Sequence, residues 1–239
     1  LIPSQRLQYI GALLDTSVVK AYPPPQRVQD ILAMIPMFQV GARVQVRKVL
    51  RLLGLMASCI LLIPNARWRM RSLQWCLRRQ WAQHNGELNA WVTIYRGVVS
   101  DLAWWGDQSN LTIGYPFHLP CPEVTVVTDA STIGWGAHLG DLEIRGFWSP
   151  EEKLCHINLL ELRAIRLALK AFVISLRGRP VQVLTDNTTA MWYVNRQGGV
   201  GSSVLCREAL RLWSWALQQR IFPVASHLAG VLNIRADSL

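Results

Sequence analysis

The stretch Val124-Thr-Val-Val-Thr-Asp-Ala-Ser-Thr-Ile-Gly-Trp-Gly136 places a carboxylate at the end of a run of β-branched residues. Such a run favours a buried strand, because branched side chains fit well on a pleated surface. Asp129 is therefore expected at the end of this strand, where a side chain is held rigidly and still meets solvent. The turn residues Ser131-Thr-Ile133 and the glycines that follow predict a second strand folded back beside the first.

Three further acidic residues stand in contexts that predict the same location. Glu161 lies near the start of a long helical pattern, where Asn158 is the expected N-cap of a capping box. Asp186 ends a second strand-like run that begins at Val181, and Asp237 lies two residues before the last residue of the sequence. Mg²⁺ prefers carboxylate oxygens and keeps several waters, so four such residues indicate a divalent-metal site.

Length and charge divide the chain into two parts. A chain of 239 residues has room for one large domain or two small ones. The residues before Pro120 include 13 basic and 5 acidic side chains, and the rest of the chain has 12 and 10. A net charge of +10, with far more arginine than lysine, favours a polyanionic partner such as a nucleic acid. A solubilising basic surface is the alternative.

Cysteine content and hydropathy indicate other properties of the chain. The five cysteines form no Cys-x-x-Cys pair, so we expect neither a zinc site nor a disulfide-linked partner, and a reducing intracellular compartment, cytoplasm or nucleus. The longest apolar run, from Leu52 to Ile63, is too short for a membrane span of roughly 20 residues. The sequence has no signal peptide and does not begin with Met, so it is expected to be a piece of a longer protein.

Hydrophobic periodicity predicts a mostly helical first part. Residues 1–20 are expected to form a hairpin, and Gly106 to Pro122 has the composition of a linker. Between these segments, helical patterns cover Gln26 to Met34, Val44 to Leu62, Arg67 to Trp81 and Glu87 to Trp105.

The second part alternates strands with helices. Strands are predicted at 123–129, 134–140, 142–148, 181–186 and 221–226. Helices are predicted at about 159–176, 188–195 and 203–219. Antiparallel strands followed by crossover units predict an α/β fold, a mixed five-stranded sheet flanked by helices.

Cationic side chains gather in the helical part. Arginines interleaved with tryptophans suit a surface that grips a phosphate backbone and covers it with rings. The alternative is that the tryptophans are ordinary packing residues of a small all-α domain. The predicted contacts to nucleic acid here are Arg43, Arg47, Lys48, Arg51, Arg78 and Arg79.

An ordered set of motifs resembles a known family. The set is Asp129-Ala-Ser with Gly134-Trp-Gly136, His156-Ile-Asn-Leu-Leu-Glu-Leu162, Leu184-Thr-Asp-Asn187, Asn195-Arg-Gln-Gly-Gly199 and Asn233-Ile-Arg-Ala-Asp-Ser-Leu239. Together these motifs resemble the ribonuclease H (RNase H) domain of a retrotransposon polyprotein, closest to the gypsy-related, DIRS-like reverse transcriptases. The resemblance covers residues 123–239 and implies an RNase H-like domain whose C-terminal helix is truncated.

The first part also resembles this family. Leu7-Gln-Tyr-Ile-Gly-Ala-Leu13 looks like the hairpin at the end of a reverse-transcriptase palm, and Val49-Leu-Arg-Leu-Leu-Gly-Leu55 looks like the thumb helix that follows. The resemblance implies that residues 1–115 are a thumb- and connection-like segment and that 116–122 are a linker. The sequence has no Tyr-x-Asp-Asp motif, so the chain itself carries no polymerase active site. The remainder of the reverse transcriptase is an expected partner.

The resemblance implies endonucleolytic hydrolysis of the RNA strand of an RNA:DNA hybrid with two Mg²⁺ ions, or with Mn²⁺. Asp129 would bridge both ions, Glu161 and Asp186 would hold the ion near the leaving 3′-oxygen, and Asp237 would hold the ion that activates water, leaving a 5′-phosphate. His227 stands ten residues before Asp237, where the family has a mobile histidine. Contacts to the hybrid are implied for Asn158, Asn187 and Gln197.

Two other interpretations remain open. The chain is alternatively a nucleic-acid-binding fragment of a reverse transcriptase that retains the fold without turnover. A third interpretation is an integrase or transposase core, which shares the general fold and the carboxylate chemistry. The position of Glu161 between the first and second aspartates argues against that third interpretation, because those enzymes usually place their glutamate last.

Overall fold

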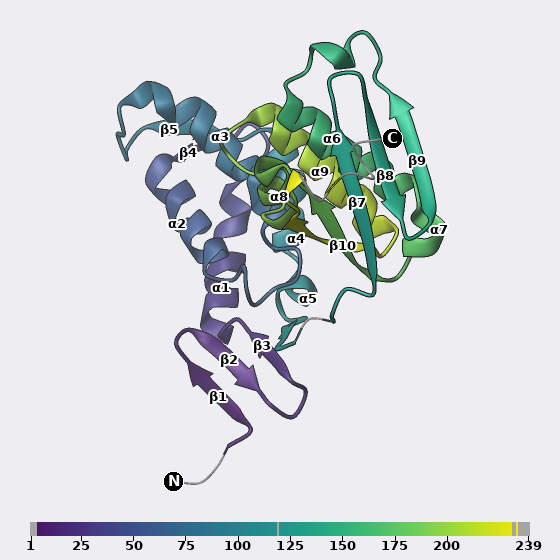
Figure 1. Cartoon of the computed structure of the whole chain (residues 1–239). Helices are drawn as coiled ribbons and strands as arrows, with labels where there is room; N and C mark the ends of the chain where they lie inside the picture. The colour runs from purple at the N-terminus through teal and green to yellow at the C-terminus, as the bar shows by residue number, and fades with distance from the viewer. Residues whose placement is uncertain (1–3, 119, 231–232, 234–239) are drawn as a thin grey trace. The chain divides into compact units, whose positions relative to one another are not determined.

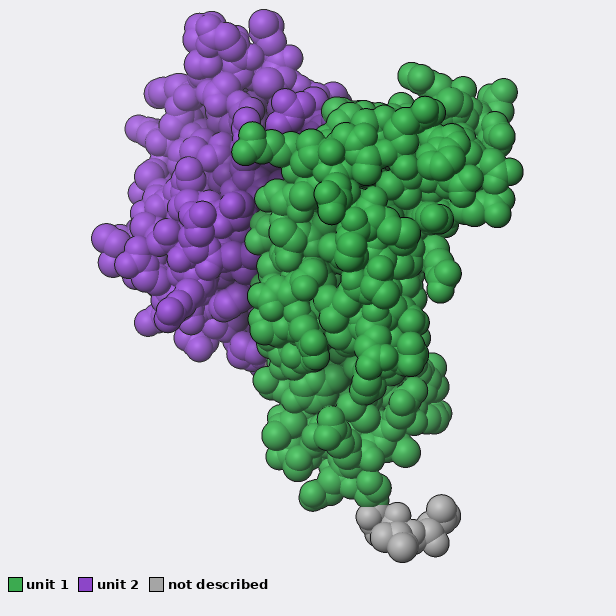
Figure 2. Space-filling model, turned by 180° about the vertical axis from the view of Figure 1, so that it is seen from behind, with its two compact units in different colours: residues 1–119 green, residues 120–239 purple. Residues whose placement is uncertain are grey.

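The computed structural model describes residues 4–118, 120–230 and 233. It divides into two compact units, residues 1–119 and residues 120–239 (Figure 2). No helix in these described ranges is long and apolar enough to cross a membrane.

Unit 1 begins with a small antiparallel sheet in the strand order β1-β2-β3-β6. Ile10 and Gly11, both with positive φ, form the turn of the predicted hairpin between β1 and β2. The last strand lies inside the segment whose composition resembles a linker, and its Tyr115 pairs with Ala21. The strands are β1 (Arg6–Tyr9), β2 (Ala12–Asp15), β3 (Lys20–Tyr22) and β6 (Tyr115–Pro116).

The rest of unit 1 is mostly helical, as the periodicity predicts. Its core is formed by apolar side chains such as Ile31, Leu52, Leu73 and Trp105, each at most 1% exposed. The helices are α1 (Pro25–Met34), α2 (Val46–Ala57), α3 (Arg71–Trp81), α4 (Arg96–Trp105) and α5 (Gln108–Leu111), with 3₁₀ turns at Ile35–Met37, Trp68–Met70 and Ala82–His84.

The predicted helix from Glu87 to Trp105 is wrong in its first half. Residues Trp91–Thr93 form strand β5, which pairs antiparallel with β4 (Arg43–Gln45), and α4 begins only at Arg96. The predicted helix over Val44 to Leu62 is correspondingly shorter, since its first residues lie in β4 and α2 ends at Ala57. The side-chain amide of Gln80 donates to the Thr93 carbonyl at 2.9 Å and accepts from the Thr93 N–H at 2.8 Å, so it pairs with the backbone of β5 as a neighbouring strand would.

Unit 2 contains the five-stranded mixed sheet predicted from the sequence, in the order β11-β10-β7-β8-β9 (Figure 1). The central strand β7 pairs antiparallel with β8 and parallel with β10, which in turn pairs parallel with β11. The α/β fold class is therefore confirmed. The strands are β7 (Val124–Ala130), β8 (Gly134–Leu139), β9 (Leu142–Phe147), β10 (Pro180–Thr185) and β11 (Phe222–His227).

Helices cover the sheet through one continuous apolar core. Val126 and Val183 of the sheet pack with Leu162 and Ile165 of one helix and with Leu212 of another, all of them fully buried. The predicted long helix is interrupted at Phe172 and forms two helices. The helices of unit 2 are α6 (Ile157–Ala171), α7 (Val173–Leu176), α8 (Thr188–Asn195) and α9 (Ser203–Gln218), preceded by a 3₁₀ turn at Glu152–Leu154.

A buried carboxylate joins α6 to α9. The Glu208 side chain is 2% exposed, and its Oε1 accepts a hydrogen bond of 2.5 Å from Nε of Arg166. Arg211 lies 3.6 Å from the other carboxylate oxygen, and Arg163 lies 4.0 Å from it. Arg163 also forms an ion pair of 2.7 Å with Glu152. Ion pairs therefore connect α6, α9 and the 3₁₀ turn before α6.

Candidate metal centre and nucleic-acid contacts

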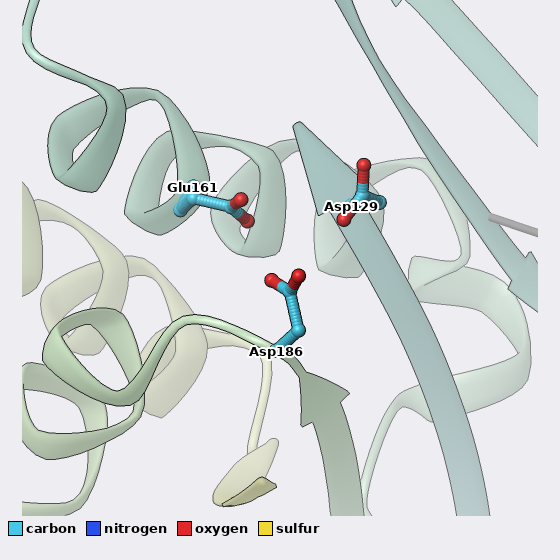
Figure 3. A group of neighbouring side chains, drawn as sticks. All are labelled: Asp129, Glu161 and Asp186. Atoms are coloured by element: carbon cyan, nitrogen blue, oxygen red, sulfur yellow. The ribbon is translucent and has the colours of Figure 1, made fainter. Parts of the chain in front are cut away.

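Three of the predicted carboxylates lie close together at one end of the strands of the unit 2 sheet. Asp129 is the penultimate residue of β7, Asp186 directly follows β10, and Glu161 lies in the second turn of α6. Because β7 and β10 are parallel neighbours, their carboxyl ends lie side by side. Each side chain offers an oxygen, and these oxygens all lie within 4.8 Å of one another. Figure 3 shows the three carboxylates pointing toward a common point.

The local fold explains why Glu161 is held rigidly. Glu161 is only 4% exposed, and it follows two buried leucines in α6. The predicted capping box is wrong, since α6 begins at Ile157 and its N-cap is His156, whose Nδ1 accepts a hydrogen bond of 3.1 Å from the Asn158 N–H. The imidazole of His156 thus caps the helix, a role that the sequence predicts for the side-chain amide of Asn158. The Asn158 side chain is therefore not needed as a cap and can form other hydrogen bonds.

The donor set fits a divalent cation. Three carboxylates this close repel one another when all are ionised, and the repulsion is strongest around a buried group such as Glu161. Hard oxygen ligands supplied by different elements are the coordination that Mg²⁺ and Mn²⁺ favour. The described residues of this cluster therefore form a centre compatible with divalent metal binding.

Gly230 and Asn233, which follow β11, lie close to two of the three clustered carboxylates. The N–H of Leu228 donates to the Thr185 carbonyl at 2.9 Å, and Asp186 Oδ2 lies 3.4 Å from where a Cβ on Gly230 would be. Asn233, 1% exposed, donates from Nδ2 to Asp129 Oδ1 at 3.1 Å. Asn233 is missing from the predicted site residues; the only signal in the sequence is its place within the last of the resembling motifs.

The last two predicted catalytic residues differ in what the structure describes. His227 is the exposed last residue of β11, and it pairs with Thr185, the residue before Asp186. His227 therefore lies at the same end of the parallel strands as Asp186. Asp237 lies outside the described residues.

Two of the predicted hybrid contacts bond to each other. Asn187 caps α8 by accepting from the Ala190 N–H at 2.9 Å, and its Nδ2 donates to Asn158 Oδ1 at 3.0 Å. Because that oxygen is the only acceptor of the Asn158 side chain, the bond fixes the orientation of the amide and identifies Nδ2 as its remaining donor. Gln197 follows α8 with a positive φ of 51°, and its N–H donates to the Val194 carbonyl at 3.0 Å.

The predicted cationic contacts of unit 1 lie on the surface of that unit. Arg43, Arg47, Lys48 and Arg51 are exposed on β4 and along one face of α2, and Arg78 and Arg79 are exposed near the end of α3. Three of these guanidinium groups lie over tryptophan rings: Arg43 over Trp91 at 5.8 Å, and Arg78 and Arg79 over Trp75 at 5.5 and 6.0 Å.

No family model and no curated protein matches this chain. Solved structures do. The chain is similar to RNase H1 from Halobacterium salinarum NRC-1, with 20% identity, 48% of this chain and 92% of that chain covered, and a TM-score of 0.41. It is also similar to LC11-RNase H1 in complex with an RNA/DNA hybrid, with 18% identity, 49% and 93% covered, and a TM-score of 0.43.

A longer similarity includes both units. The foamy viral protease-reverse transcriptase in complex with an RNA/DNA hybrid matches 93% of this chain, at 10% identity and a TM-score of 0.37. This chain spans only 29% of that viral chain. With identities of 20% or less and TM-scores below 0.5, these similarities carry no argument about what this chain does. The chemistry of this protein must therefore follow from its own side chains.

Proposed function

We propose that this protein is a ribonuclease H that hydrolyses the RNA strand of RNA:DNA hybrids with two divalent metal ions. The observation that carries the proposal is the convergence of Asp129, Glu161 and Asp186 within 4.8 Å, from two parallel strand ends and a helix. The order of the surrounding motifs along the sequence supports RNase H chemistry in particular.

In this proposal Asp129, Glu161 and Asp186 would hold the metal ions, together with Asp237 as a fourth ligand. Two bound Mg²⁺ ions supply an attacking water made acidic and an electrostatic partner for the leaving 3′-oxygen. His227, exposed at the end of β11, takes or gives a proton as the 5′-phosphate product leaves. Mn²⁺ is the alternative ion, since it accepts the same oxygen ligands.

The asparagine pair supplies recognition of the hybrid. The bond from Asn187 occupies Asn158 Oδ1, so Asn158 Nδ2 is the group left to donate to an oxygen of the nucleic acid. A 2′-hydroxyl is an acceptor that RNA has and DNA lacks. We assign this pair, together with Gln197, to contacts in the minor groove of the hybrid.

The proposal extends to unit 1. Its hairpin and helices correspond to the palm-end hairpin and the thumb- and connection-like segment of a reverse transcriptase, so the chain is a piece of a DIRS-like retroelement polyprotein. The exposed cations from Arg43 to Arg79 then bind phosphates. Exchanging Arg78 and Arg79 for alanine should lower the salt dependence of hybrid binding, by roughly 0.9 in slope for each phosphate that is no longer neutralised. Arg6→Ala, an exposed arginine outside this cluster, is the control.

Cleavage of a labelled hybrid tests the proposal directly. The purified chain with Mg²⁺ should cut the RNA strand and leave the DNA strand intact, and Asp129→Asn should abolish cleavage. Absence of cleavage by the wild type, or equal cleavage by the variant, would contradict a nuclease. Hybrid binding without any cleavage would instead identify a nucleic-acid-binding fragment.

A further inference from the structure

One buried amide links the segment after β11 to the proposed metal centre. The N–H of Leu228 donates a hydrogen bond to the carbonyl of Thr185, the last residue of β10. Further along, the Asn233 N–H donates to the Gly230 carbonyl at 2.9 Å. The Asn233 side chain is thereby directed at the end of β7, the strand that carries Asp129.

The hydrogen bonds of this amide have a defined direction. Asn233 Nδ2 donates to Asp129 Oδ1 at 3.1 Å and lies 3.4 Å from the Thr128 carbonyl oxygen. Both neighbours are acceptors, so only the nitrogen of the amide suits this place. A hydrogen bond to a carboxylate is shorter and stronger than one between neutral groups, and here it forms at a side chain that is 1% exposed. The bond therefore restricts the rotation of the Asp129 carboxylate.

Asn195 shows what a purely structural amide does in the same unit. Its Nδ2 donates to the Ala225 carbonyl at 2.7 Å, and its Oδ1 accepts from the Ala225 N–H at 2.8 Å. Both bonds go to the backbone and join α8 to β11. Asn233 differs because its shorter hydrogen bond goes to a side-chain carboxylate of the cluster.

We propose that Asn233 is a positioning residue, which holds the Asp129 carboxylate in the orientation that binds the metal ions. This inference rests on the proposed function, since it gives that metal centre a further residue. Groups that orient a metal ligand typically change metal affinity or activity 10- to 100-fold when they are removed. Because Asn233 is buried, it acts through Asp129 and does not touch the hybrid.

Metal binding without nucleic acid provides a test that is independent of turnover. Mn²⁺ binding to the full chain, followed by the paramagnetic resonance signal of the free ion, gives the dissociation constant. Asn233→Ala and Asn233→Leu, the second of which fills the same volume, should each raise this constant about tenfold or more. In cleavage assays the same variants should keep the KM for the hybrid and lose rate at low Mg²⁺, and added Mg²⁺ should restore part of the rate.

Two controls separate positioning from folding. Asn195→Ala also removes amide hydrogen bonds and should leave the Mn²⁺ constant unchanged. In a double-mutant cycle, Asn233→Ala should cause no further loss of affinity in a chain that already carries Asp129→Asn.

Three results would overturn the inference while leaving the proposed function intact. These are wild-type Mn²⁺ binding in both Asn233 variants, an equal loss of affinity in Asn195→Ala, and additive effects in the cycle. A wild-type chain that binds no Mn²⁺ would overturn the proposed function itself, and this inference with it.

Discussion

Asn187 Nδ2 donates a hydrogen bond of 3.0 Å to Asn158 Oδ1 and so joins the start of α8 to the start of α6. The two residues are 29 positions apart in the sequence, yet one directly follows Asp186 and the other lies three residues before Glu161. The amide pair therefore joins the start of α6, the helix that carries Glu161, to the start of α8, which follows Asp186. In the proposed function, a hybrid bound at those carboxylates passes close to this pair.

Asn158→Asp tests the recognition role of this pair. The substitution keeps an oxygen that accepts from Asn187 but replaces the outward donor with a second, negatively charged acceptor. We expect hybrid affinity to fall about tenfold, which corresponds to roughly 1.4 kcal/mol, with little change in melting temperature. Gln219→Glu is a matched control, because it adds the same charge and keeps the hydrogen bond accepted from Arg177. Equal effects in both variants would reduce the result to general repulsion.

Removing one charge from the carboxylate cluster should stabilise the metal-free protein. Three carboxylate oxygens within 4.8 Å repel one another, so Asp186→Asn relieves a repulsion that the wild type tolerates. We expect a gain of about 1 kcal/mol in the free energy of unfolding without divalent ions. Added Mg²⁺ should stabilise the wild type more than the variant, since binding to the folded state shifts the unfolding equilibrium. Thermal unfolding with and without a chelator measures both effects.

The buried Glu208 should contribute strongly to stability. Glu208→Ala leaves Arg166 without the carboxylate that it contacts at 2.5 Å, in a position that is only 16% exposed. Breaking such a pair from one side costs about 3 to 5 kcal/mol. Arg211→Ala removes a partner of the same carboxylate whose side chain is 62% exposed, and it should cost less than about 1 kcal/mol. Urea denaturation of both variants tests the difference, and similar changes in stability would contradict it.

Asp101 should make the stability of unit 1 depend on pH. Burial raises the pKa of Asp101 above its ordinary value, although Arg69 lies 3.3 Å away. The folded state then keeps a proton that the unfolded state has already released, so this group contributes less stability as the pH rises from the ordinary pKa through the raised one. Asp101→Asn cannot ionise. Its stability relative to the wild type should increase with pH over that interval and then become constant, and denaturation at several pH values shows whether it does.

The sequence predicts the elements of unit 2 closely. The predicted helix at 188–195 is α8 itself. The predicted strands are shifted by one residue at both ends relative to β7 and β10, and the prediction for β8 is one residue too long at its end. Each element there has a strong local signal, either β-branched runs bounded by glycine or apolar residues at helical spacing. The approach of Asp129, Glu161 and Asp186 follows from their positions at the ends of those elements.

Other features depend on contacts that local patterns do not encode. Residues 91–94 have too few apolar positions to distinguish a short strand from a helical turn, and β5 exists because Val92 pairs with Val44, far away in the sequence. Asparagine is a frequent N-cap and histidine an uncommon one, so the sequence favours Asn158 as the cap of α6, whereas the structure has His156 there. The contact between Asn233 and Asp129 forms only when the chain folds back to β7, and local sequence patterns do not predict it.

The strand order of unit 2 also determines what the chain presents while it is being synthesised. The antiparallel strands β7, β8 and β9 leave the ribosome first, and β10, the parallel neighbour of β7, emerges only after α6. Until then the side of β7 that later pairs with β10 has unpaired backbone groups next to a row of valines, which is a template for aggregation with other nascent chains. A translation product that stops before β10 should therefore depend on chaperones. The Asp129 side chain gains its neighbour Asp186 only when β10 pairs with β7.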